Sequence, residues 1–305
     1  MSNTTEAVKG EYVQNALAPV PGRSPRPKRG AVNTVVWFVV LLGLTIVVLY
    51  PLVWLFLATF KPAGEFGQNP GMFPQNPTLE NYVKVLDGIA GIPLWRFFAN
   101  SVFLAVMSVV GTIVSSSMAA YAFARVKFMG QKILFAAMIG TLLLPFHVII
   151  IPQYIIFQKL DLIDTYVPLL LGRFLATEAF FIFLIVQFIR NIPQDMDEAA
   201  RLDGAGHARI FFSIILPLIR PALVTTAIFT FIGSWNDFLG PLLYVNSPEQ
   251  YPLPVALRLY NDATSGSDLG ATFAVSFLAL LPILIFFIVF QRFLIAGVAT
   301  QGLKG

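Results

Sequence analysis

FFANSVFLAVMSVVGTIVSSSMAAYAFA, residues 97–124, contains no acidic, basic or histidine side chain. Crossing the hydrocarbon core of a bilayer as a helix takes about 20 consecutive apolar residues, and this stretch is longer. Only a helix or a closed barrel satisfies every backbone group in lipid, and an unbroken apolar run lacks the period-two alternation of a barrel strand. Gly111 and the serines at 115–117 suit close contact between helices. The stretch therefore predicts a membrane-spanning helix.

Further apolar runs lie on both sides of it. The chain has 305 residues, 57% hydrophobic and 12% charged, with a mean hydropathy of +0.76. This is too little polar surface to cover a water-soluble globule. Pro145 and Pro152 predict a kink or a broken end in the third run, and Glu178 is expected near the middle of the fourth. The runs predict an all-α integral membrane protein with six transmembrane helices, within residues 30–60, 97–124, 133–157, 167–189, 219–243 and 269–291.

Basic residues predict the orientation. With the amino terminus inside the cell, 14 of the 20 Lys and Arg residues fall on the cytosolic side, where such residues are enriched in membrane proteins. We therefore expect a multi-pass protein of the cytoplasmic (inner) membrane with both termini cytosolic. Four regions follow from this topology. They are a disordered basic cytosolic tail (1–34), the first transmembrane helix with an external loop (35–95), a helical core (96–292) that includes a cytosolic segment (190–220), and a cytosolic carboxyl-terminal tail (293–305).

Several classes of protein are excluded by residues that the chain lacks. It has no cysteine, and His147 and His207 lie in different segments, so no metal site is expected. There is no Gly-x-x-x-x-Gly-Lys-Ser/Thr phosphate loop and no Gly-x-Ser-x-Gly motif. We therefore predict no catalytic residue, no cofactor and no enzymatic activity. The net charge of +4 is explained by cytosolic basic residues, so no nucleic-acid partner is expected.

The segment between the fourth and fifth runs reads IPQDMDEAARLDGAGHARIFFSIILP, residues 192–217. Pro193 fits the first position of a helix, and the acidic residues after it favour a helix amino terminus. Gly204 permits the turn that ends this helix, so two short helices should meet at 204–206. Ala199 and Ala200 are expected on the surface of the first. From the residues alone, an ordinary connecting loop and a docking site for another protein both stay open.

A wider pattern in this segment resembles a known family. Glu198-Ala199-Ala200, Gly204, Ile214 and Leu216-Pro217 match the spacing of the EAA loop of bacterial ABC importer permeases. The Arg-Leu-Asp insert resembles the carbohydrate-uptake branch, the MalG-like binding-protein-dependent transport system inner membrane components. The likeness covers roughly residues 35–305. It implies the ABC transmembrane type-1 (MetI-like) permease fold, with an ABC permease core at 96–292.

The resemblance also implies partners and roles. In that family the EAA helix docks on a dimer of cytosolic ATPase subunits, which hold ATP and Mg²⁺. An external solute-binding protein delivers the sugar, and a second, homologous permease completes the route through the bilayer. The docking role falls on Glu198, Ala199, Ala200, Asp203, Gly204, Ile214, Leu216 and Pro217. Residues 302–305 have a possible contact role with the ATPase.

Polar residues inside the apolar runs are candidates for the translocation pathway. Intramembrane ionisable groups are costly and usually face a cavity or a partner, which singles out Glu178, Asn236 and Asp237. A hydrogen bond to another helix is the alternative for Glu178. The partner permease of maltose-type systems can hold the sugar alone, so this chain could line a route without owning a site. Two other functions stay open, a permease for glycerol phosphate or another small polar solute, and an ion-coupled secondary transporter.

Overall fold

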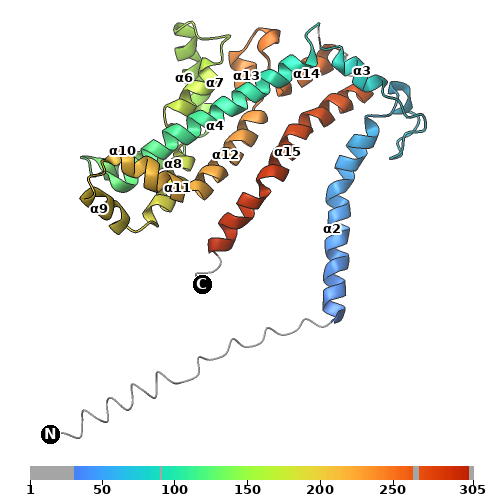
Figure 1. The fold of residues 1–305 in the computed structure, drawn as a ribbon. Helices are drawn as coiled ribbons and strands as arrows, with labels where there is room; N and C mark the ends of the chain where they lie inside the picture. The colour runs from blue at the N-terminus through green and yellow to red at the C-terminus, as the bar shows by residue number, and fades with distance from the viewer. Residues whose placement is uncertain (1–30, 90, 264–267, 302–305) are drawn as a thin grey trace, which may run out of the picture. The chain divides into compact units, whose positions relative to one another are not determined.

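A computed structural model describes residues 31–89, 91–263 and 268–301 of the chain (Figure 1). Within these ranges every regular element is a helix, and the single backbone bridge, Ile89 to Ile92, is isolated. The chain divides into two compact units, residues 1–53 and 54–305. The predicted tail at 1–34 lies almost entirely outside the described residues.

The helices occur in this order along the chain. They are α2 (Ala31–Ala58), η1 (Ala63–Glu65), α3 (Glu80–Leu86), α4 (Leu94–Arg125), α5 (Gln131–Thr141), α6 (Phe146–Lys159), α7 (Val167–Phe174), α8 (Ala179–Arg190), α9 (Asp195–Leu202), α10 (His207–Ile210), the π-helical η2 (Phe211–Ile215), α11 (Leu216–Leu218), α12 (Arg220–Trp235), α13 (Leu239–Tyr244), η3 (Pro248–Gln250), α14 (Leu253–Ala263) and α15 (Leu269–Gln301).

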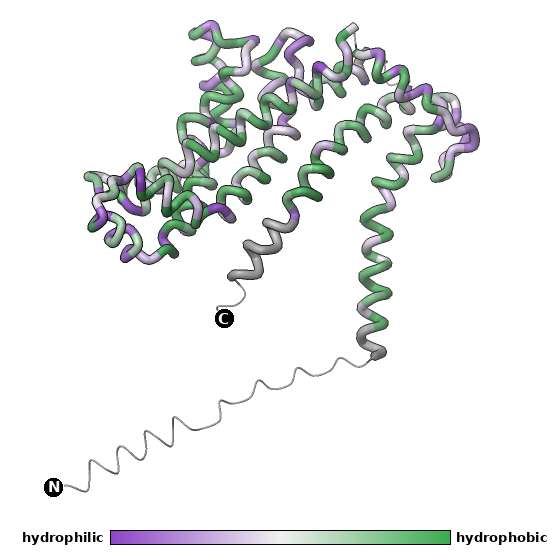
Figure 2. The backbone as a smooth tube through the Cα atoms, in the orientation of Figure 1, coloured by the Kyte–Doolittle hydropathy of each residue, from purple (hydrophilic) through white to green (hydrophobic). Residues whose placement is uncertain are grey.

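The described helices agree with an all-α membrane protein. Four spans are long and apolar enough to cross a bilayer: Val35–Ala58, Leu94–Arg125, Val167–Arg190 and Leu269–Gln291. Two bent pairs, α5 with α6 and α10–α11 with α12, raise the number in the described part to six if each counts as one span. Figure 2 shows the long helices as mainly hydrophobic, with hydrophilic residues at helix ends and in loops, those around α9 among them. The six predicted spans are consistent with this range.

Helix α12 packs against both α4 and α15 in the second unit (Figure 1). Gly111 of α4 allows α7 to approach closely, because a Cβ there would lie 2.8 Å from the ring of Phe174. This is the small-residue contact that its sequence predicts. A buried cluster under α9–α11 joins α4 and α8 to the segment 190–220 through residues that include Tyr121, Ile182, Ile185, Ile189, Ile210, Ile215 and Ile219.

Three of the predicted spans are broken, and the positions of the breaks matter for the site. The third breaks before Pro145, as expected, and α5 and α6 are bent by 102°; Pro152 lies inside α6. The fourth breaks between α7 and α8, where Ala176 has φ 56°, so Glu178 lies at the break and not within a continuous helix. The fifth ends at Trp235 and resumes at α13. Only the first of these breaks has a proline directly at it, Pro145, which precedes the first residue of α6.

The segment between α8 and α12 has the predicted form, with one correction. Helices α9 and α10 meet around Gly204, whose φ of +81° is in the left-handed region that favours glycine. Helix α9 begins at Asp195 after Gln194, so Pro193 precedes the helix and does not occupy its first position. Helix α15 continues to Gln301, past the predicted end of its span at Gln291.

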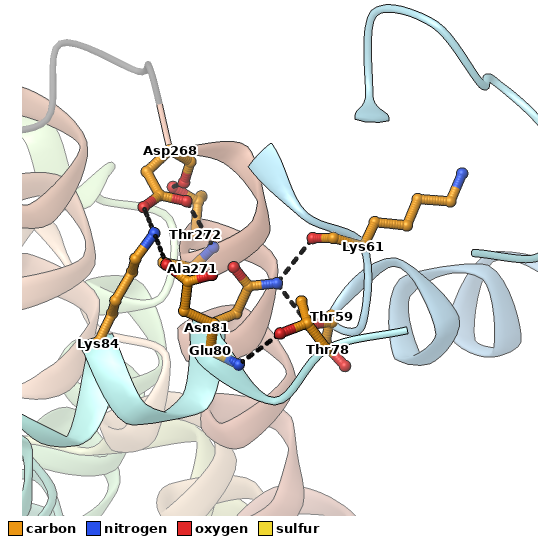
Figure 3. Close-up of polar contacts among 9 residues, drawn as sticks. All are labelled: Thr59, Lys61, Thr78, Glu80, Asn81, Lys84, Asp268, Ala271 and Thr272. Carbon is orange, nitrogen blue, oxygen red and sulfur yellow. Dashed lines mark hydrogen bonds and ion pairs between the residues drawn. The ribbon is translucent and has the colours of Figure 1, made fainter. Parts of the chain in front are cut away.

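Polar contacts attach α3 to the start of α15 and to the end of α2 (Figure 3). Asn81, 1% exposed, donates hydrogen bonds to the carbonyls of Thr59 (2.7 Å) and Lys61 (2.8 Å). Lys84 forms an ion pair with Asp268 at 3.2 Å, and Asp268 accepts a hydrogen bond from the backbone of Ala271. These contacts give the segment before α4 a defined position in the second unit.

Candidate functional site

Helix α9 is a short exposed helix at one end of the second unit. Its first turn carries Asp195, Asp197 and Glu198, the charge sign that the amino-terminal end of a helix dipole favours. Backbone N–H groups of Asp203 and Ala205 bond back to the carbonyls of Ala199 and Ala200, which closes the carboxyl end of the helix. The backbone of α9 therefore has a defined beginning and a defined end.

The predicted docking residues divide by exposure. Glu198, Ala199, Asp203, Gly204 and Pro217 are exposed. The other three are half-buried: Ala200, Ile214 and Leu216. Ala200 and Leu216 pack against the cluster under α9–α11, which corrects the expectation that Ala200 lies on the surface. These two residues hold the segment to the core.

A buried ion pair fixes α9 to α4. The carboxylate of Asp197 lies 2.9 Å from Nε of Arg125, and the two side chains are only 4% and 3% exposed. The other end of the guanidinium donates to the carbonyl of Ile192 at 2.6 Å. Sequence reasoning missed this pair. The signal was an arginine ending a long apolar helix and an aspartate directly before Glu198, but nothing in either segment identifies its partner.

A second contact from α4 reaches α10. The hydroxyl of Tyr121 and Nδ1 of His207 are 3.0 Å apart. Residues four apart lie on one face of a helix, so Tyr121 and Arg125 project from the same side of the last turns of α4. We call these two residues the α4 clamp. It binds α9 and α10 on either side of the turn at Gly204.

A polar cavity of about 270 Å³ adjoins the clamp and Glu198. Its lining is Ala124, Arg125, Val126, Lys127, Gln131, Gln194, Asp197, Glu198 and Arg201. Oδ1 of Asp197 has no hydrogen-bond partner among the described residues, although it is buried. The exposed Glu198 is thus the outermost member of a charged group that continues to the end of α4.

Two of the three pathway candidates share a second cavity. Glu178 forms an ion pair with Arg173 at 2.5 Å. Asp237 accepts a hydrogen bond from the backbone N–H of Gly240 at 3.1 Å. Both carboxylates line one cavity of about 360 Å³. Asn236 lines a different one, of about 300 Å³, next to Trp235 and Ser276.

Other residues of the 360 Å³ cavity were not predicted. Gln153 on α6, Thr177 at the helix break and Tyr244 at the end of α13 complete its polar lining. They were missed because the fourth and fifth runs resemble continuous helices, and a continuous helix does not direct these positions to one place. We call this space the α6–α7–α13 cavity.

Asp164 fixes the position of Tyr244. Its backbone N–H donates to the carbonyl of Tyr244 at 2.7 Å. Its carboxylate accepts hydrogen bonds from the backbone N–H groups of Asn246 and Ser247 and from the Ser247 hydroxyl. These bonds, that of the Ser247 hydroxyl most of all, hold the pKa of Asp164 below its ordinary value.

Acidification should break the hydrogen bonds that the carboxylate of Asp164 accepts from Asn246 and Ser247. A carboxyl group whose pKa is lowered by folding stabilises the fold above its ordinary pKa, and the stabilisation is lost as the pH falls through the lowered value. We expect hydrogen exchange at the amides of Asn246 and Ser247, corrected for intrinsic rates, to be slow at pH 5–7 and to accelerate below about pH 4. Asp164→Asn, which tolerates the left-handed backbone at φ 63°, should exchange fast throughout.

Asp161→Asn is the control for this measurement, because the carboxylate of Asp161 has no hydrogen-bond partner among the described residues. It should exchange as the wild type does. Equal protection in Asp164→Asn and the wild type at neutral pH would contradict the assigned role of Asp164.

Among the described residues no group of three or more His, Cys, Asp or Glu side chains is placed to hold a metal ion. The two sites offer charged and hydrogen-bonding side chains, Glu198 at the first and Asp237 at the second. The surface around Glu198 is suited to contact with a protein, and the α6–α7–α13 cavity to a polar solute.

Comparison with known proteins gives consistent matches. Residues 111–299 match the family described as binding-protein-dependent transport system inner membrane component. The arabinooligosaccharides transport system permease protein AraQ of Halalkalibacterium halodurans is 35% identical, over 85% of this chain and 92% of AraQ. The diacetylchitobiose uptake system permease protein NgcG of Streptomyces coelicolor is 32% identical, over 85% of this chain and 84% of NgcG.

A solved structure has a similar fold. It is a chain in the crystal structure of a bacterial ABC transporter involved in the import of the acidic polysaccharide alginate. The TM-score is 0.75 and the sequence identity 24%, with 88% of this chain and 99% of that chain covered.

Proposed function

Because the chain belongs to the family of binding-protein-dependent transport system inner membrane components, we propose that it is a membrane-spanning permease subunit of an ATP-binding-cassette importer for a carbohydrate. The observation that carries this proposal is the exposed helix α9, with Glu198 and Ala199 on its surface and Asp197 anchored to α4. An exposed helix with a rigid attachment to the membrane helices can transmit movement of a partner to them.

Mono- or oligosaccharides are the proposed solutes. Two relatives are named for arabinooligosaccharides and diacetylchitobiose, and a third, 29% identical, is the trehalose/maltose transport system permease protein MalG of Thermococcus litoralis. These compounds share many hydroxyl groups, which need hydrogen-bonding partners on leaving water. Glu178 and Asp237 in the α6–α7–α13 cavity, and Asn236 in the neighbouring one, are the proposed pathway residues.

The proposed partners follow from the family and from α9. A dimer of separate ATPase subunits, which bind ATP and Mg²⁺, docks on Glu198, Ala199, Asp203 and Gly204. Ala200, Ile214 and Leu216 support that surface from the core side of the segment, and the exposed Pro217 extends it. A second, homologous permease completes the route, and an external solute-binding protein delivers the sugar.

The distribution of charge supports a proposed orientation. Arg125, Lys127 and Arg201 line the polar cavity beside α9, so basic residues gather at this end of the second unit. By the positive-inside rule it faces the cytosol, in a bacterial cytoplasmic membrane, with both termini on that side. The segment from Lys61 to Thr78 then faces outward.

Reconstitution of the assembled complex tests the proposed function. The chain is produced with the second permease, the ATPase and the binding protein encoded beside it, and uptake of neutral oligosaccharides into proteoliposomes is measured together with ATP hydrolysis. We expect uptake that requires ATP and the binding protein. The purified single chain should neither transport the solute nor hydrolyse ATP. ATP turnover by the single chain, or uptake without the ATPase, would contradict the assignment.

A further inference from the structure

The α6–α7–α13 cavity has the size and lining of a ligand site. Its volume of about 360 Å³ lies within the range of about 300 to 1,000 Å³ that small-molecule sites occupy. Most of its wall is apolar, including Phe146, Ile149 and Leu169, and the polar groups come from different helices. A few polar groups set in an apolar wall are what orients a bound small molecule.

One buried hydroxyl in this wall has unused hydrogen-bonding capacity. Tyr244 is 3% exposed, and its hydroxyl has no hydrogen-bond partner among the described residues. Its ring is held in place by Tyr154, which stacks on it with the centroids 6.0 Å apart, and by the edge-on contact with Phe157. Buried polar groups are nearly always hydrogen-bonded, and this hydroxyl, which lies just beneath the cavity surface, gains a partner from the cavity through a small movement of the wall.

The carboxylate of Asp237 also keeps an unused oxygen. Oδ1 accepts the bond from Gly240, whereas Oδ2 accepts none from the described residues. Gly240 makes room for this oxygen, because a Cβ there would lie 2.7 Å from Oδ2 and 3.1 Å from Leu169. An ionised carboxylate is an acceptor only, and a hydroxyl group is a donor that suits it.

The charges of the cavity favour an uncharged solute. Arg173 is the only cation among the described residues that line it, and Glu178 already pairs with it. An anionic solute would find no unpaired cation in the described wall and would lie beside Asp237. Burying a charge without a partner is unfavourable, whereas a neutral polyol needs only hydrogen bonds.

We infer that this chain itself binds the solute, and that the α6–α7–α13 cavity is a contact site for a neutral, hydroxyl-rich molecule, with Asp237 and Tyr244 binding its hydroxyl groups. The inference rests on the proposed function and deepens it, since it gives this subunit a site of its own. It also sets the preferred class of solute, because phosphorylated and uronic-acid compounds should bind this cavity more weakly than neutral ones.

Direct binding to the purified, nucleotide-free complex tests the site. Calorimetric titration uses three neutral probes, galactotriose, arabinotriose and maltotriose, and one acidic probe, trigalacturonic acid. We expect at least one neutral probe to bind, and trigalacturonic acid, which differs from galactotriose by its carboxylates, to bind at least about 10-fold more weakly than the best neutral probe. The absence of binding by all three neutral probes would overturn the inference, as would equal binding of the acidic one.

Three variants test the two groups. Tyr244→Phe should raise the Kd of the best neutral probe about 5-fold, because one hydrogen bond between uncharged groups is lost, and Asp237→Asn about 10-fold or more, because the lost bond is to a charge. Gly240→Ala keeps Asp237 but displaces its carboxylate, so its effect should follow that of Asp237→Asn. Unchanged Kd values in all three would assign the cavity no part in binding.

Two matched controls separate a local loss from general damage. Tyr154→Phe removes a hydroxyl from the ring stacked on Tyr244 but outside this cavity, and Glu249→Gln neutralises an exposed carboxylate that does not line it. Both should bind within about 2-fold of the wild type. Losses in the controls equal to those in the site variants would also overturn the inference. Uptake by the reconstituted complex is a separate measurement, so normal uptake without probe binding contradicts only this site.

Discussion

Replacing Asp197 with alanine is expected to release α9 from the membrane helices, with the largest effect of any single substitution proposed for this chain. Removing one partner of a buried ion pair leaves the other charge uncompensated and costs about 3–5 kcal/mol. Here the charge left behind is Arg125, which is 3% exposed and also supports the carbonyl of Ile192. Hydrogen exchange of the α9 amides should accelerate by about 100-fold or more if that cost falls on this segment alone.

A double substitution makes this prediction specific to the charge. Exchanging both partners of a buried pair for apolar residues of similar volume is often neutral. Arg125→Met combined with Asp197→Leu should therefore regain much of the protection that Asp197→Ala loses. Asp195→Ala, in the same turn but exposed, is the matched control and should exchange as the wild type does. Wild-type protection in Asp197→Ala would show that the α4 clamp does not hold α9.

Substitutions on the exposed face of α9 are expected to uncouple the ATPase without disturbing α9 itself. Glu198→Lys reverses the one exposed carboxylate beside the polar cavity, and Ala199→Leu adds bulk at an exposed position. An exposed ion pair contributes about 0–1 kcal/mol, but a charge enclosed in an interface contributes more. Both variants should insert normally yet lose the ATPase on purification, or hydrolyse ATP without uptake.

Gly204 provides a test of the turn that directs α9. A Cβ at this position would meet nothing within 4 Å, so a side chain would not clash with its surroundings. It would be unfavourable because of the left-handed backbone conformation at φ +81°. Gly204→Val should therefore uncouple uptake, whereas Gly204→Asn, which tolerates this backbone, should retain it. If Glu198→Lys, Ala199→Leu and Gly204→Val all retain the ATPase and transport at the wild-type rate, α9 is a connector and the proposed docking role is wrong.

The position of Ala200 changes which alanine tests docking. The sequence predicted both alanines on the surface, but Ala200 packs against the cluster under α9–α11. A bulky residue at Ala200 would disturb that packing as well as any interface, so its effect would not distinguish the two. Ala199 is the exposed position, and it is the better probe of close approach by a partner.

The sequence by itself determined the features that depend on composition and local order. Uncharged apolar runs long enough to cross a bilayer identify membrane helices, because an unpaired backbone group in lipid is too costly for any irregular span. The turn at Gly204 and the acidic start of α9 were also predictable, since both depend on neighbouring residues only. The spacing of residues 198–217, which resembles that of the EAA loop, was enough to indicate the family, because such a motif lies within one short segment.

Only the tertiary structure decided where helices break and which residues of different helices meet. The break at Ala176 follows neither a glycine nor a proline, and the pairing of Arg173 with Glu178 becomes visible only once α7 and α8 are separated. The same holds for Arg125 with Asp197, and for Asp237 with Tyr244 in one cavity. Such contacts join segments whose apolar side chains can be buried in lipid or in the protein core whether or not these polar residues pair. Their pairing is therefore set by how the helices pack and where they break. It cannot be predicted from the hydropathy of the sequence.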